Sequence, residues 1–192
     1  IAEERAQDHD RAFVWMQRAL LEDPSHDHTL GEVERLGQML DGWPQLANTY
    51  ADAAQGASEP ATRASIGKRL ARVYEEEIGD IAKAEEAHRF VLGATPHDEQ
   101  SLESLDRIYA ENGAHEALAT VLRRRIEGGD IPADQVDWSF RLGRILADDL
   151  QRTDEAIAVY QKVLSDLEPE HGDSIKALQD IYTRKGDWQN LH

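Results

Sequence analysis

The sequence predicts an all-α fold, an α-solenoid of about 11 helices in which antiparallel helix pairs stack in tandem. Three observations indicate this fold. One residue pattern returns at a fixed period, apolar residues recur at helical spacing along the chain, and turn signals separate the helical stretches by only a few residues. Short connections make consecutive helices antiparallel neighbours, and each amphipathic pair buries its apolar face only against the next pair.

The repeat is clearest in residues 80–118, whose pattern returns 72 or 73 positions later. The matching residues are Ala84 and Ala156, Val91 and Val163, Leu92 and Leu164, Pro96 and Pro169, Ser101 and Ser174, Leu105 and Leu178, Ile108 and Ile181, Tyr109 and Tyr182, Gly113 and Gly186, and Leu118 and Leu191. The same period reaches back to Asp8, Ala12, Leu20 and Pro24. We therefore expect one solenoid over residues 1–192, with 72-residue double repeats near 8–79, 80–151 and, in part, 152–192. Because the chain starts without Met and ends within a repeat, we expect it to be a piece of a longer repeat protein.

Four helices are expected before residue 80, each bounded by a proline, a glycine or a capping residue. The first covers about 2–21 and is ended by Pro24, and the second runs to Leu40 after an N-cap at Ser25 or Asp27. The third is short, starts near Pro44 and carries Leu46, Tyr50 and Ala53. The fourth covers about 61–77, with Ile66, Leu70 and Val73 on its apolar side. The loose stretch 55–60 is expected to be a loop within the array, because the period continues through it.

Further helices are expected from residue 80 onward. One helix follows the turn at Gly79-Asp80 and ends before Pro96, and the next covers about 98–111 and ends at a left-handed C-cap formed by Asn112-Gly113. A third runs from there to Glu127, and a fourth from Pro132 to about Leu150. The last three are a helix with Thr153 as its N-cap, a helix over about 173–184, and a helix from Asp187 onward.

Residues within this pattern resemble the tetratricopeptide repeat, a helix-turn-helix unit of about 34 residues. That family places a Leu-Gly pair and an aromatic residue in its first helix, and Ala, an aromatic residue, a small residue and a closing Pro in its second. The best matching set is Leu142, Gly143, Leu146, Ala156, Tyr160, Val163 and Pro169, and a less complete set is Leu70, Ala71, Tyr74, Ala84, His88, Val91 and Pro96.

The resemblance covers essentially the whole chain, at about five repeats, and is to the multi-repeat type found in bacteria. Two repeat types alternate here, so the true unit is the pair. The family implies a right-handed superhelix whose concave face, built from each first helix, receives a peptide or helix of a partner protein. It implies no catalysis.

The charge balance limits the class of partner. The chain has 21 Lys and Arg against 38 Asp and Glu, a net charge of −17. Such a field repels nucleic acid and anionic lipid, so we expect a protein or peptide partner and no nucleic acid. The alternative is that the acidity only keeps a long repeat protein soluble. The lack of cysteine and of a long apolar run favours a cytoplasmic protein that does not insert into a membrane.

Arginine recurs at one position of the first helices, two residues after an apolar residue of the frame. These arginines are Arg35, Arg72, Arg107 and Arg144, at intervals of 37, 35 and 37 residues. In the resembled family this position faces the groove, where guanidinium groups could hold carboxylates or backbone carbonyls of a ligand. The alternative is that each arginine pairs with an acidic residue of the adjacent repeat and bridges the stack.

Six further residues share the groove-facing register: Gln100, Glu103, Phe140, Asp148, Lys176 and Arg184. Of these, Phe140, Gln100, Lys176 and Arg184 are expected to contact a partner. A large apolar side chain such as Phe140 could anchor a partner in the groove. Its alternative role is burial against the neighbouring helix.

The sequence shows no constellation typical of catalysis or cofactor binding. His26-Asp27-His28 is a compact group of potential zinc ligands, but the two-residue spacing at a helix start points the imidazoles apart. His115-Glu116 lacks the second His of a zinc-protease motif, and Gly128-Gly129 lacks the Lys-Ser/Thr of a phosphate loop. We therefore expect no catalytic residue, metal or cofactor.

The expected function is a non-catalytic scaffold that binds a partner protein or peptide along the concave face of the helical array. The alternative is a structural or self-assembling spacer that holds flanking domains apart. The sequence leaves self-association open.

Overall fold

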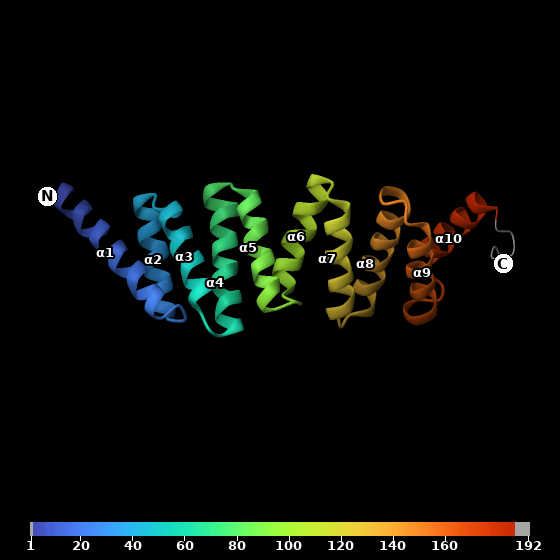
Figure 1. Ribbon diagram of the computed structural model, residues 1–192, viewed down its shortest axis with the longest axis horizontal. Helices are drawn as coiled ribbons and strands as arrows, with labels where there is room; N and C mark the ends of the chain where they lie inside the picture. The colour runs from blue at the N-terminus through green and yellow to red at the C-terminus, as the bar shows by residue number, and fades with distance from the viewer. Residues whose placement is uncertain (1, 187–192) are drawn as a thin grey trace. The chain divides into compact units, whose positions relative to one another are not determined.

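The computed structural model describes residues 2–186, with side chains from residue 8 onward. Within this range the chain forms ten α-helices and three short π-helical segments, and no strand occurs there (Figure 1). The all-α prediction is confirmed. The helix expected from Asp187 onward lies outside the described residues.

The chain divides into two compact units, residues 1–101 and 102–192. The first unit contains α1 (Ala2–Glu22), α2 (Asp27–Leu40), α3 (Trp43–Gly56), α4 (Pro60–Arg72), η1 (Val73–Ile78) and α5 (Ile81–Ala94). The boundary falls in α6 (Glu99–Asn112). The second unit continues with α7 (His115–Gly128), α8 (Pro132–Arg144), η2 (Ile145–Asp149), α9 (Thr153–Lys162), η3 (Val163–Leu167) and α10 (Gly172–Lys185).

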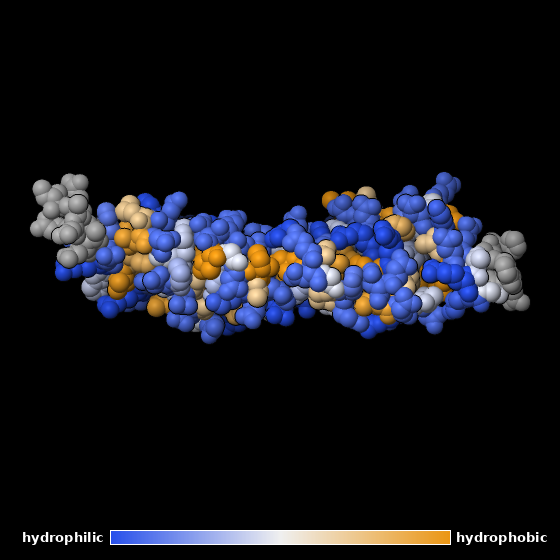
Figure 2. Space-filling model, turned by 90° about the horizontal axis from the view of Figure 1, so that it is seen from above, coloured by the Kyte–Doolittle hydropathy of each residue, from blue (hydrophilic) through white to orange (hydrophobic). Residues whose placement is uncertain are grey.

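Packing within each unit is local in sequence. In the first unit α1 packs on α2 and α3, α3 packs on α4, and α4 packs on α5; in the second, α7 packs on α8, α8 on α9, and α9 on α10. Each of these helices therefore packs against helices that are near it in the chain, which is the consecutive packing of an α-solenoid. Much of the surface seen in Figure 2 is hydrophilic, with hydrophobic residues interspersed.

Two predicted helices continue past their α-helical part. Helix α4 passes directly into the π-helical η1, so that residues 60–78 cover the expected 61–77. Helix α8 continues in the same way into η2 and reaches Asp149, close to the expected end at Leu150. A π-helical turn accommodates an extra residue without ending the helix, so the apolar pattern alone does not reveal it.

Three first helices begin with the same kind of cap, placed 72 or 73 residues apart. The Nδ1 atom of His26 accepts a hydrogen bond from the Thr29 N–H at 3.2 Å, and His171 does the same for Ser174 at 3.3 Å. Between them in the chain, the Asp98 carboxylate accepts from the Ser101 N–H at 3.0 Å. The side chain that caps the first of these helices is thus His26.

Two expected N-caps were therefore wrong by one residue. Ser25 or Asp27 was expected to cap α2, but the helix begins at Asp27, which leaves His26 at the capping position. Thr153 was expected to cap α9, but it is the first helical residue, and its predecessor Arg152 makes no side-chain cap. The left-handed cap at Gly113 is confirmed, with φ of 65°.

Candidate functional site

The second unit has a cleft of about 410 Å³ between α8–η2 and α10, with one residue of α9 in its lining. Its lining residues are Phe140, Arg144, Ala147, Asp148, Tyr160, Asp173, Lys176, Ala177, Asp180, Ile181 and Arg184. Half of the residues predicted to contact a partner, namely Phe140, Arg144, Lys176 and Arg184, therefore meet in one cleft.

Helical periodicity places these side chains on the cleft side of two helices. On α8 and η2, Phe140, Arg144 and Asp148 follow one another at intervals of four residues and line one wall. The neighbouring Leu142 and Gly143 are buried. On α10 the buried residues Ser174, Leu178, Ile181 and Tyr182 hold the helix in place. The charged residues between them line the second wall.

One end of the cleft is aromatic. The ring of Phe140 lies 5.8 Å from that of Tyr160 and 5.4 Å from the imidazole of His171. Phe140 is half-buried, so it packs on these two rings and still presents surface to the cleft. Burial raises the pKa of Tyr160 to about 12, with a further contribution from the Asp148 carboxylate, so the phenol is neutral at physiological pH.

Six of the residues that line the cleft are charged. Three are cationic (Arg144, Lys176, Arg184) and three are anionic (Asp148, Asp173, Asp180), and none forms an ion pair with another residue in the range 8–186. The Arg184 guanidinium only reaches the backbone oxygen of Asp180, at 3.4 Å. These six groups are therefore available to a ligand.

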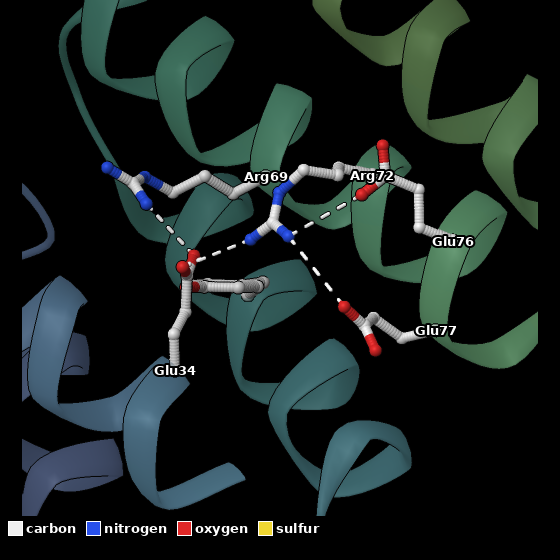
Figure 3. Close-up of polar contacts among 6 residues, drawn as sticks. Glu34, Arg69, Arg72, Glu76 and Glu77 are labelled. Atoms are coloured by element: carbon white, nitrogen blue, oxygen red, sulfur yellow. Dashed lines mark hydrogen bonds and ion pairs between the residues drawn. The ribbon is translucent and has the colours of Figure 1, made fainter. Parts of the chain in front are cut away.

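Arg72 has a different environment in the first unit (Figure 3). Its guanidinium lies 3.0 Å from the carboxylate of Glu34 on α2, and 3.8 and 4.0 Å from those of Glu76 and Glu77. Arg69 also binds Glu34, at 2.9 Å. Two arginines of α4 thus clamp one glutamate of the preceding first helix, which is the bridging role that the sequence left open.

The carboxylate of Glu34 is held in its charged form. Burial acts to raise its pKa, but hydrogen bonds from the Tyr50 hydroxyl, at 2.7 Å, and from Arg69 outweigh burial and leave the pKa below its ordinary value. Burial, together with the bond to Glu34, in turn raises the pKa of Tyr50. The group is a satisfied network and not an open site.

Asp106 is the counterpart of Glu34 in the second unit, 72 residues later. Its side chain is only 8% exposed and receives two hydrogen bonds from Arg141, at 2.8 and 2.6 Å, and one from Arg125 at 2.9 Å. Arg125 also lies with its guanidinium 4.4 Å from the ring centre of Trp138. The carboxylate is fully occupied by these two arginines.

This occupancy explains why Arg144 forms no ion pair with a described residue although its counterpart Arg72 does. Asp106 is one methylene shorter than Glu34 and is already bound by Arg125 and Arg141. One turn after Arg144 the chain has Asp148, whereas one turn after Arg72 it has Glu76, whose side chain is longer. Asp106 and Asp148 are thus both shorter than the glutamates near Arg72, and neither pairs with Arg144.

Sequence reasoning missed the bridging pairs because it considered only the position two residues after the apolar residue. The pairs Arg69–Glu34 and Arg141–Asp106 each span 35 residues and are themselves 72 residues apart. An acidic residue followed 35 positions later by arginine, twice at the repeat period, was the signal that could have revealed them.

The remaining predicted contact residues lie outside the cleft lining. Arg35 binds Glu32 of its own helix at 2.9 Å, and Arg107 lies 3.8 Å from Glu111. Gln100 is exposed at the start of α6. Over the described part of the chain, no group of three His, Asp or Glu residues is placed to hold a metal ion, and His26 serves as the cap of α2.

Residues 139–173, which run from α8 through α9 to the start of α10, match the family model of the tetratricopeptide repeat. This segment is a tetratricopeptide-like repeat. The match includes the buried Leu142, Gly143 and Tyr160, so the resemblance is confirmed at its best-fitting segment. No curated protein sequence matches the chain. The bacterial origin of the repeat type stays a prediction.

Tetratricopeptide repeats in general are scaffolds for protein–protein interaction, and such all-helical repeat folds are typically non-catalytic. The matched repeat supplies Phe140, Arg144, Asp148 and Tyr160 to the cleft, and α10 supplies the opposite wall. Among residues 2–186, no helix combines the length and the apolar character needed to cross a bilayer.

Proposed function

We propose that this chain is a non-catalytic scaffold and that the cleft between α8–η2 and α10 binds a segment of a partner protein. The observation that supports this most strongly is the set of six charged side chains that form no ion pair with another residue in the range 8–186. Ion pairs at exposed sites contribute only about 0.2–1 kcal/mol each, so several must act together with an apolar contact. Phe140 supplies that contact at the aromatic end of the cleft.

The proposal assigns different roles to the predicted arginines. Arg144 contacts the partner together with Lys176, Arg184 and Phe140. Arg72 bridges α4 to α2 and stabilises the stack. Arg35, Arg107 and Gln100 are exposed and are secondary candidates for partner contact. The net charge of −17 favours a protein or peptide over nucleic acid as the ligand.

The test is selection of ligands from a random peptide display library on the full chain. Selected peptides are then measured against a variant carrying Phe140→Ala, Arg144→Ala and Lys176→Ala. The matched control is Phe90→Ala, Arg89→Ala and Lys83→Ala, which removes the same residue types from the exposed side of α5 in the first unit. We expect the cleft variant to bind about tenfold or more weakly and the control to bind like the wild type.

Two results would contradict the proposed function. In one, selection yields no peptide with saturable binding. In the other, the selected peptides bind the cleft variant as tightly as the wild type, which would place the binding surface elsewhere.

A further inference from the structure

The charged residues of the cleft are ordered by sign along α10. Asp173, Lys176, Asp180 and Arg184 occupy positions i, i+3, i+7 and i+11, and all four line the cleft. Their signs read minus, plus, minus, plus. On the facing wall, Arg144 and Asp148 repeat the alternation one turn apart.

This order excludes a uniformly charged ligand as the best fit. An acidic segment would be attracted by Arg144, Lys176 and Arg184 but repelled by Asp148, Asp173 and Asp180, which line the same cleft. Like charges placed opposite each other destabilise an interface and suppress wrong partners. A ligand that satisfies all the groups must itself alternate in sign.

The spacing of the charges favours a helical ligand. At about 1.5 Å rise per residue, the four charges of α10 lie about 4.5–6 Å apart along the axis and span about 16.5 Å. A second helix presents its own positions i, i+3, i+7 and i+11 at the same steps. In an extended segment the residues of one face lie about 6.6–6.8 Å apart, so after three steps it is out of register by about 3.5 Å.

We propose that the cleft binds one α-helix of a partner protein whose exposed stripe carries charges of alternating sign. The helix runs parallel to α10, with Lys or Arg opposite Asp173 and Asp180 and with Asp or Glu opposite Lys176 and Arg184. An apolar residue of the same helix packs on Phe140. This inference rests on the proposed function, because it specifies the ligand of the same cleft.

The test compares three designed helical peptides on the full chain by fluorescence anisotropy at low ionic strength. The first carries Arg, Glu, Arg and Glu at positions i, i+3, i+7 and i+11, with one Leu on the same face. The second has the same composition but the order Arg, Arg, Glu, Glu, which leaves half of the pairs mismatched in either direction of binding. The third carries Glu at all four positions.

We expect the alternating peptide to bind about tenfold more tightly than the other two, with the difference shrinking as salt is added. Equal binding of the three peptides, or tightest binding of the acidic one, would overturn the proposal.

A charge reversal gives a second, sharper readout. Lys176→Glu places a negative charge opposite the first Glu of the alternating peptide and is expected to weaken its binding about tenfold. Changing that Glu of the peptide to Arg is expected to restore binding to Lys176→Glu and to weaken binding to the wild type. Lys176 is exposed, so the variant keeps the fold. If the changed peptide fails to restore binding, the proposed pairing is wrong.

The outcome also separates this proposal from the one on which it rests. If library-selected peptides depend on Phe140, Arg144 and Lys176 but carry no alternating charges, the helical pattern is wrong and the protein-binding cleft stands. If no peptide depends on these residues, both proposals are wrong.

Discussion

At the residue scale, the packing of α8 on α9 depends on the absence of a side chain at Gly143. A Cβ atom at this position would lie 2.5 Å from Cε1 and 2.6 Å from Cζ of Tyr160, whose side chain is 1% exposed. The same ring forms part of the cleft and contacts Phe140. A change at Gly143 therefore acts on stability and on the shape of the cleft together.

We predict that Gly143→Ala lowers the free energy of unfolding by about 1–3 kcal/mol, because the added methyl group forces the Tyr160 ring or the backbone to move. The measurement is urea unfolding followed by circular dichroism. The matched control is Gly93→Ala on α5, where a Cβ meets nothing within 4 Å and alanine has the higher helix propensity. If Gly143→Ala is as stable as Gly93→Ala, the close contact between the Tyr160 ring of α9 and Gly143 of α8 is wrong.

The network around Glu34 predicts a pH dependence of stability. The pKa of Glu34 is lowered in the folded chain, so the unfolded chain binds more protons to this group in acid. Its contribution is fully present above the ordinary carboxyl pKa, about 4.5, and is lost as pH falls through the lower folded value. We expect Glu34→Gln to destabilise the chain by about 1–3 kcal/mol at pH 7 and progressively less in acid, as measured by urea unfolding across pH. If the difference in unfolding free energy between Glu34→Gln and the wild type stays constant with pH, this linkage is ruled out.

At the element scale, neighbouring first helices meet in two ways. Arginines of α4 and α8 reach back to one carboxylate of the preceding first helix, at Glu34 and Asp106. Between α8 and α10 no such bridge forms, and the charged side chains line an open cleft instead. In the second unit, one junction is closed by charge pairing and the next presents its charges to a ligand.

We predict that Asp106→Asn destabilises the chain by about 3–5 kcal/mol, because it leaves the half-buried Arg125 and its neighbour Arg141 without their shared carboxylate. The comparison is Asp180→Asn in the cleft, where the carboxylate is exposed and makes no ion pair with a described residue. That variant should differ from the wild type by less than about 0.5 kcal/mol in thermal or urea unfolding. Similar losses for both variants would contradict the distinction between the two junctions.

The elements and four of the residues that line the cleft could be predicted from the sequence for physical reasons. Apolar periodicity reflects burial directly, so the helix from residue 60 to 78 was expected within one residue at each end. Phe140, Arg144, Lys176 and Arg184 were found because helical spacing places them on one side of their helices. The sequence could not predict that Arg72 forms an ion pair while Arg144 forms none with a described residue, because pairing depends on which carboxylate of another helix lies within reach. A single methylene separates Glu34 from Asp106.

At the scale of the whole molecule, the strongly negative chain contains a cleft whose six charged residues sum to zero. The overall field disfavours polyanions, while under the proposed function the local order of charges selects among protein segments. The net charge and the cleft therefore act on selectivity at different scales in this proposal.

We predict that the chain shows no saturable binding to single-stranded or duplex oligonucleotides at physiological salt, since 38 acidic residues face 21 basic ones. Fluorescence anisotropy of labelled oligonucleotides provides the measurement, with a library-selected peptide as the positive control. Saturable, salt-sensitive binding of an oligonucleotide would contradict the assignment of a protein partner.

The central claim is that the cleft between α8–η2 and α10 is where the partner binds. Chemical-shift mapping by NMR, with the full chain titrated by a library-selected peptide, tests this most directly. The account predicts shifts clustered at Phe140, Arg144, Lys176 and Arg184, with those around Lys83, Arg89 and Phe90 of α5 unchanged. Shifts concentrated on α5 or on the Glu34 network, with the cleft residues unaffected, would contradict it.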